Sequence, residues 1–195
     1  MELAGAWMIA VGLAVGLAAL VGLHILPTGL SPVCNAVSQY GITRYRNGYR
    51  VQTLAYAVAG IGAALGLANL PGSITLVVVL CIVFAAARAA IGWFPMDAPG
   101  SERTTTGRRH TALAIIAFAA AGIAPGSLAR LLRHDGIHPA VASASDALAF
   151  LMLIAFVSMT VSRKPQGGFF GLAERGFYVS MTAWFAIVAV MLFHS

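Results

Sequence analysis

Six long apolar stretches, separated by short polar connections, fill nearly the whole chain and constrain its fold more than any other feature. Each is close to the roughly 20 residues that a helix needs to cross about 30 Å of hydrocarbon. The pattern therefore predicts an all-α protein, a polytopic membrane bundle of six transmembrane helices. The stretches cover residues 3–23, 51–70, 74–94, 111–129, 140–161 and 172–193.

The low content of charged residues argues against a soluble helical domain. Only 9% of the 195 residues are charged and 59% are hydrophobic, whereas soluble domains carry about 25% charged residues. Residues 3–23 contain no charge, so this helix would offer water no polar face. We expect a single membrane-embedded helical domain over residues 1–195. We also expect residues 3–23 to remain as the first helix, because the run is longer than the apolar core of a signal peptide.

The distribution of arginine and lysine predicts the orientation in the membrane. If the N-terminus lies outside, nine cations fall on the opposite side, and only Arg130 and Arg133 fall on the outer side. Cytoplasmic loops carry such an excess, so we predict that both termini face outward. Because these cations flank membrane segments rather than a soluble face, we expect membrane lipid as a partner and no nucleic acid. The nine are Arg44, Arg46, Arg50, Arg103, Arg108, Arg109, Arg163, Lys164 and Arg175.

Short connections and small residues predict how the helices pack. The connection at residues 70–73 makes the second and third helices antiparallel neighbours. Small residues recur at a spacing of four, with Gly12 and Gly16 in the first helix and Gly62 and Gly66 in the second. Such faces allow helices to approach closely in lipid. We also expect Pro125 to kink the fourth helix.

Two cytoplasmic loops are richer in polar residues than simple connectors need to be. The first holds His24, Ser38 and Tyr40, and the second lies between Asp97 and His110. The helices that flank these loops end at the same face of the membrane. We therefore expect the polar side chains to gather at the cytoplasmic end of the bundle.

Short motifs in and beside these loops resemble those of domain-of-unknown-function family 998. They are His-x-x-Pro at residue 24, Ser-x-Tyr-Gly at 38, Phe-Pro-x-Asp at 94, Thr-Gly-x-x-His at 106 and Gly-Leu-x-x-Arg at 171. The resemblance runs from about His24 to Trp184. It implies a small bacterial or archaeal protein with about six spans, a multi-pass protein of the cytoplasmic (inner) membrane, and it carries no established activity.

The leading functional hypothesis is a polar, cationic vestibule that faces the cytoplasm. Its arginines would bind an anionic lipid or a small anionic solute, as basic pockets at the cytoplasmic leaflet do. The structural alternative is that Asp97 and His110 only cap helices and tether loops. The candidate binding residues are His24, Tyr40, Arg44, Arg46, Arg50, Arg88, Arg108, Arg109, Glu174 and Arg175.

An enzymatic alternative is an intramembrane hydrolase that acts on a lipid. Ser38, Asp97 and His110 have the residue types of a hydrolytic site, with the histidine as general base. Zinc hydrolases of the alkaline ceramidase kind need three histidines, and only His24 and His110 lie on the cytoplasmic side. We therefore expect no metal and no other cofactor.

Charged residues inside the stretches suggest a third alternative, a small proton- or ion-coupled transporter. Arg88 lies about 9 Å from the inner boundary, where it either extends to the interface or pairs with Glu174. Asp146 lies near the outer end of the fifth helix, where it is either neutral or faces a wet cavity. His134 and His138 are expected to be solvated loop residues, with an outer metal site as the alternative. The oligomeric state stays open.

Overall fold

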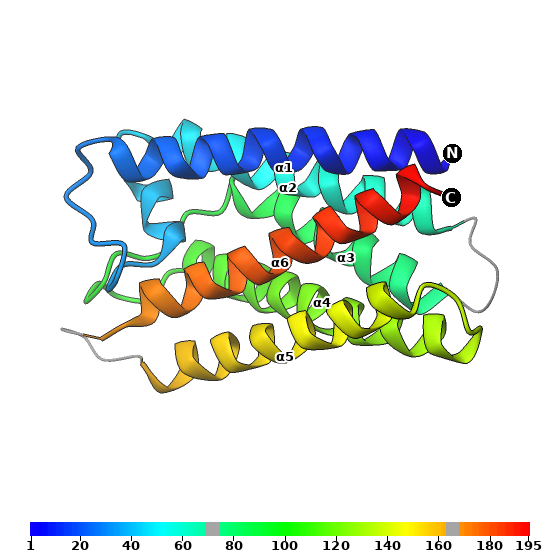
Figure 1. Cartoon of the computed structure of the whole chain (residues 1–195). Coiled ribbons are helices and arrows are strands. Elements are labelled where there is room, and N and C mark those ends of the chain that lie inside the picture. Colours follow the sequence, from blue (N-terminus) through cyan, green and yellow to red (C-terminus); the bar gives the residue numbers. More distant parts are fainter. Residues whose placement is uncertain (69–74, 163–167) are drawn as a thin grey trace.

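The computed structural model describes residues 1–68, 75–162 and 168–195, and all regular structure within them is helical (Figure 1). The order along the chain confirms the predicted all-α class. The elements are α1 (Glu2–Ile25), the 3-10 helix η1 (Val37–Ile42), α2 (Arg46–Leu67), α3 (Thr75–Ile91), α4 (Thr105–His134), α5 (Pro139–Val161) and α6 (Phe170–Phe193).

Five of these helices, α1, α2, α4, α5 and α6, are long and apolar enough to cross a membrane, by length and composition. The sixth, α3, is apolar but has only 17 residues. The chain thus has the character of a multi-pass membrane protein. The predicted connection at residues 70–73, together with Arg163 and Lys164, lies outside the described residues.

The helices form a closed ring. Each long helix packs against its neighbours in the chain, and α6 returns to pack against α1. The N- and C-termini lie together at one end of the bundle, and the connections 26–45 and 92–104 lie at the opposite end (Figure 1). We call the latter the loop end and the former the terminal end. The ring places the loop-end halves of α3, α4 and α6 around one space.

Close packing between α1 and α2 confirms the predicted small-residue faces. A Cβ added at Gly12 would lie 2.6 Å from the Ala55 carbonyl oxygen, and one at Gly62 would lie 2.7 Å from the Gly5 carbonyl oxygen. Real side chains do not tolerate such distances, so only glycine permits this approach of the two backbones. In lipid this close packing replaces the hydrophobic effect as the force that holds helices together.

Several helices begin earlier than the apolar stretches predict. The α4 helix starts at Thr105, because the side chain of Thr104 caps it by accepting a hydrogen bond from Gly107 N at 3.0 Å. His110 therefore lies inside α4, whereas the sequence placed it before the helix. Hydropathy marks only the part of a helix that lipid surrounds, and a polar first turn escapes it. The helix also continues through Pro125 to His134.

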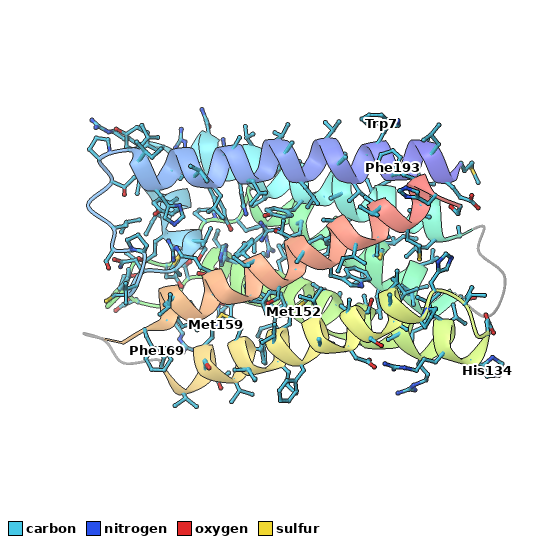
Figure 2. The ribbon with its side chains drawn as sticks, in the orientation of Figure 1. Trp7, His134, Met152, Met159, Phe169 and Phe193 are labelled. Carbon is cyan, nitrogen blue, oxygen red and sulfur yellow. The ribbon has the colours of Figure 1, made fainter. Side chains whose placement is uncertain are left out.

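The terminal end is packed mainly with apolar and aromatic side chains. Trp184 of α6 is fully buried beside Phe185, and Leu128 and Leu132 of α4 are fully buried as well. The rings of Trp7 and Phe193 meet edge to face at 5.2 Å and join α1 to α6 near the two termini (Figure 2). The polar residues predicted to be functional lie at the other end.

Candidate functional site

A cavity of about 1030 Å³ opens at the loop end. Its walls come from the loop-end halves of α3, α4, α5 and α6 and from Tyr49 of α2, and its floor comes from residues 34–39 and 96–103. We call this cavity the vestibule. Six of the residues predicted from the sequence line it: Ser38, Arg88, Asp97, Arg108, His110 and Glu174.

Two adjacent side chains of α6 hold the floor of the vestibule in place. Glu174 Oε2 accepts a hydrogen bond from Val37 N at 2.6 Å, at the start of η1. Arg175 donates from Nε to His24 Nε2 at 2.7 Å and from Nη1 to the Asn35 carbonyl oxygen at 2.9 Å. Its Nη2 also donates to the Tyr40 hydroxyl at 3.4 Å. These bonds connect α1, the first loop and α6.

Three of the predicted binding residues therefore hold the first loop in place and do not line the vestibule. His24 donates from Nδ1 to the Leu20 carbonyl oxygen at 2.6 Å and accepts from Arg175 at Nε2, so both ring nitrogens are occupied. His24, Tyr40 and Arg175 fix the position of η1, and none of them lines the vestibule. The His-x-x-Pro, Ser-x-Tyr-Gly and Gly-Leu-x-x-Arg motifs meet at this contact.

Arg88 is the most unusual side chain of the vestibule. It is only 4% exposed, so it does not extend to the interface, which was one of the two arrangements expected from the sequence. Its Nη2 donates to Gln52 Oε1 at 2.8 Å, and its guanidinium lies 5.4 Å from the centre of the Tyr178 ring. No ion pair joins it to Glu174 in the described part of the chain. A buried cation without a carboxylate partner is costly, which makes Arg88 a candidate for binding an anion.

Buried polar atoms without hydrogen bonds also gather here. Among the described residues, three of the five buried side-chain atoms that lack a partner lie here: Arg88 Nε, Gln52 Nε2 and Gln39 Oε1. The other two, Ser145 Oγ and Trp184 Nε1, lie elsewhere. Arg88 and Gln39 line the vestibule, and Gln52 is bonded to Arg88. Buried polar side chains nearly always find a partner. These atoms therefore indicate a place where a bound molecule or water completes the hydrogen bonds.

Asp97 ties the second loop to the start of α4. Its carboxylate accepts hydrogen bonds from Thr104 N at 3.1 Å and from Thr104 Oγ1 at 2.6 Å. The same carboxylate packs so closely on Gly107 that an added Cβ would overlap it. This contact explains why a glycine follows the threonine in Thr106-Gly107. It is the tethering role considered for Asp97 in the structural alternative.

The three predicted catalytic residues share the vestibule without contacting one another. The Ser38 hydroxyl donates to Met96 Sδ at 3.2 Å, and His110 Nδ1 donates to the Phe94 carbonyl oxygen at 2.7 Å. No hydrogen bond joins any two of Ser38, Asp97 and His110 among those the described residues make. A nucleophile normally lies within hydrogen-bond reach of its base.

The remaining arginines divide into two groups. Arg108 and Arg103 line the vestibule, although Arg103 was counted from the sequence only as a topology signal. Arg50 instead donates to the Gly92 carbonyl oxygen at 3.1 Å, and Arg109 lies over the Phe94 ring at 5.8 Å. The predicted binding arginines of the two loops that do not line the vestibule are Arg44, Arg46, Arg50 and Arg109.

At the terminal end, charged side chains pair with one another. Asp146 of α5 forms an ion pair with Arg133 of α4, and both side chains are about half exposed, at 44% and 51%. The sequence suggested that Asp146 is neutral or faces a wet cavity. Besides pairing with Arg133, Asp146 lines a second cavity of about 520 Å³ together with Arg130 and Arg133. The His134 side chain is exposed and bonds to Asp135. No group of three or more metal-binding side chains occurs within residues 1–68, 75–162 and 168–195.

Gln52 and Tyr178 are two residues beside Arg88 that the sequence analysis did not name as site residues. Gln52 contacts Arg88 directly, and Tyr178 lines the vestibule beside it. The signal for Gln52 was present, since it is one of very few strongly polar residues in the stretch 51–70. A polar side chain that is expensive to bury marks either a partner or a ligand. Tyr178 gave no comparable signal.

Comparison with known proteins places the chain in a family. No match was found among curated proteins or among solved structures. A family model described as "Protein of unknown function (DUF998)" matches residues 6–191, which include every motif and every vestibule residue described above. The chain therefore belongs to the DUF998 family.

Proposed function

We propose that this protein binds a molecule with an anionic head, either a membrane lipid or a small solute, in the vestibule. The observation that carries the proposal is Arg88, a buried guanidinium that lines the cavity and has, among the described residues, neither a carboxylate partner nor a hydrogen bond at Nε. Phosphate and carboxylate oxygens are the natural acceptors for such a group. The protein would hold Arg88 in a position that only an anion completes.

The charges of the lining support an anionic ligand. Arg88, Arg103 and Arg108 face Asp97 and Glu174, but the two carboxylates are already engaged. Asp97 accepts from Thr104, and Glu174 accepts from Val37 N. The cations therefore keep donors available, while much of the acidic capacity is used within the protein.

The cavity is also amphipathic, which favours a ligand with an apolar part. Beyond the polar groups its wall consists of apolar side chains, among them Phe118 of α4 and Phe156 and Met159 of α5. Its volume of about 1030 Å³ is at the upper end of small-molecule sites, which span about 300–1,000 Å³.

We further propose that the chain crosses the membrane six times, with the loop end in the cytoplasm and both termini outside. The apolar α3 would supply the sixth crossing beside the five long apolar helices. The arginine-rich connections and the two termini lie at opposite ends of the bundle (Figure 1). The positive-inside rule predicts that the end with the arginine-rich connections faces the cytoplasm. The vestibule would then open at the inner leaflet of a bacterial or archaeal cytoplasmic membrane.

A hydrolase is the second candidate, because Ser38, Asp97 and His110 line the same cavity. The Nδ1 bond of His110 to the Phe94 carbonyl oxygen fixes its tautomer and leaves Nε2 as an acceptor. Binding is favoured over hydrolysis because the Ser38 hydroxyl donates to Met96 and the Asp97 carboxylate is bonded to Thr104.

The test is head-group selection by purified protein with and without the Arg88 charge. Native mass spectrometry would measure the retention of phosphatidylglycerol and of phosphatidylcholine with identical acyl chains, added together to wild type and to Arg88→Gln. Hydrogen bonds to charged groups contribute about 1.5–3 kcal/mol, and about 1.4 kcal/mol is tenfold in affinity. We therefore expect the preference for the anionic lipid to fall about tenfold or more.

Arg130→Gln is the matched control, since Arg130 is an exposed arginine of α4 at the terminal end. It should keep the wild-type preference. A folded Arg88→Gln protein that retains the wild-type ratio of the two lipids would overturn the proposal. If Arg88→Gln and Arg130→Gln lower the preference for the anionic lipid equally, the lipid is held by non-specific surface charge. That result would also overturn the proposal.

A further inference from the structure

We infer that the ligand is a lipid of the surrounding bilayer, which enters the vestibule sideways between α4 and α5 and leaves its acyl chain in that gap. The inference rests on the proposed anion-binding function and names the source of the ligand. A soluble anion would reach the same arginines from the water at the loop end, so the two sources differ in route and in what fills the apolar wall.

The gap arises from the way α4 and α5 are connected. They are joined at the terminal end through residues 135–138 and separate toward the loop end (Figure 1). The vestibule occupies the separation, because its lining includes a stripe of α4 that faces three residues of α5. The stripe consists of Thr111, Ala114, Ile115 and Phe118, and the α5 residues are Phe156, Met159 and Thr160.

The spacing of the stripe gives the gap its depth. Positions 111, 114, 115 and 118 lie on one face of a helix. Phe118 lies eight residues beyond His110, which is about 12 Å along the helix axis at 1.5 Å per residue. The vestibule therefore extends from the polar loop end well into the region that hydrocarbon would surround, and at that depth its α4–α5 side is apolar, opposite Arg88.

Two residues show that the gap opens to the outside of the bundle. Ile115 is 50% exposed and Thr160 is also exposed, although both line the vestibule. Residues that contact the cavity and the exterior together form its rim. Because both belong to helices long and apolar enough to span a membrane, the exterior at the rim is hydrocarbon rather than water. The opposite wall is closed, since Arg88, Ile91 and Glu174 are buried.

The lining combines cationic and apolar groups, as an inner-leaflet lipid combines a charged head with apolar chains. Arg88 lies at the depth of the apolar stripe, against the Tyr178 ring that Phe118 also contacts, and Arg103 and Arg108 lie nearer the loop end. A lipid of the cytoplasmic leaflet presents its anionic head at that end and its acyl chains toward the bilayer centre. A free phosphate would satisfy Arg88 but leave the gap between Ile115 and Phe156 without a fitting occupant.

The test combines photo-crosslinking from the acyl chain of a lipid with substitutions that block the rim. The protein would be placed in nanodiscs that contain phosphatidylglycerol with a diazirine in its acyl chain, illuminated, and digested for mass spectrometry. We expect labelled peptides from α4 around 111–118 and from α5 around 156–160. Ile115→Trp should reduce this labelling about fivefold or more, because the indole fills the rim.

Ile116→Trp is the matched control. Ile116 is the next residue of the same helix, it is 43% exposed, and it does not line the vestibule. Labelling should stay at the wild-type level in this variant. Thr160→Trp on the α5 side of the rim is a second blocking variant, so that a folding defect in Ile115→Trp does not decide the result.

The outcomes separate the two proposals. If Ile115→Trp and Thr160→Trp label as strongly as wild type, or if glycerol 3-phosphate displaces the lipid as readily as a phosphatidylglycerol without diazirine does, the lateral route is wrong while the Arg88 site stands. If Arg88→Gln labels at the wild-type level and keeps the head-group ratio, the anion-binding function itself is wrong. Labels confined to the faces of α1 and α2 would also overturn the lateral route.

Discussion

Arg88 and Arg133 are both arginines on apolar helices, yet the two ends of the bundle use them in opposite ways. At the terminal end, Arg133 pairs with Asp146, and both side chains are about half exposed. At the loop end, Arg88 is buried, donates to the amide oxygen of Gln52 and lies over the rings of Tyr56 and Tyr178, and its Nε has no hydrogen-bond partner among the described residues. The terminal pair needs nothing more, whereas Arg88 is incomplete within the described residues.

The difference teaches where to look for function in a helical membrane protein. A membrane charge that finds its counterion locally is explained by the stability of the fold. A buried charge that is left to an amide and two aromatic rings costs stability that these contacts offset only in part. Such a group is retained when a ligand supplies the missing partner.

The largest effect should come from removing the arginine that holds the vestibule floor. Arg175→Ala breaks hydrogen bonds to His24, to Tyr40 and to two backbone carbonyl oxygens. We expect the free energy of unfolding to fall by about 3 kcal/mol, since breaking a network around a buried or partly buried charge costs this much. Unfolding in mixed micelles by increasing denaturing detergent measures it.

Arg133→Ala is the comparison at the terminal end. It removes an ion pair that is about half exposed, so the loss should stay below about 1 kcal/mol. Equal losses for Arg175→Ala and Arg133→Ala would erase the distinction between the two ends.

A smaller effect should follow from adding one methyl group to α4 at either end. Gly107→Ala places a Cβ on the Asp97 carboxylate, and forced overpacking costs about 1–3 kcal/mol. It should lower the melting temperature and displace the loop that Asp97 tethers. Gly126→Ala adds the same atom 3.9 Å from the nearest contact, Ala149 Cβ, so it should be neutral or gain up to about 1 kcal/mol of helix propensity.

The melting temperatures of the two glycine variants are measured by thermal unfolding in the same detergent. A melting temperature for Gly107→Ala equal to or above that of Gly126→Ala would show that the Asp97 contact is not rigid. The vestibule floor would then be looser than described.

The helices were predictable because lipid imposes a strong and simple rule on sequence. Apolar runs of about 20 residues mark the hydrocarbon crossings, and the five long apolar helices contain or overlap those runs. The polar first turns of α4 were not predictable in the same way. Their helical state depends on the Thr104 cap and on Asp97, and neither contributes to hydropathy.

The site was predictable in its residue types but not in its contacts. Spacing indicated that Ser38, Asp97 and His110 reach one end of the bundle, and all three line the vestibule. It did not indicate that each is bonded to a different partner. The partners of Arg88 and Asp146 depend on how the helices rotate and lean against one another, which sequence distance does not encode. Gln52 was the exception, since an amide in an apolar stretch signals a buried polar contact.

The most direct test of the account is an experimental structure of the protein in nanodiscs made with phosphatidylglycerol. The account predicts elongated density in the vestibule, with an oxygen of the head group within hydrogen-bond distance of Arg88 Nε and a chain passing between Ile115 and Phe156. A vestibule that holds only water, with Arg88 turned to an ion pair with Glu174, would contradict it.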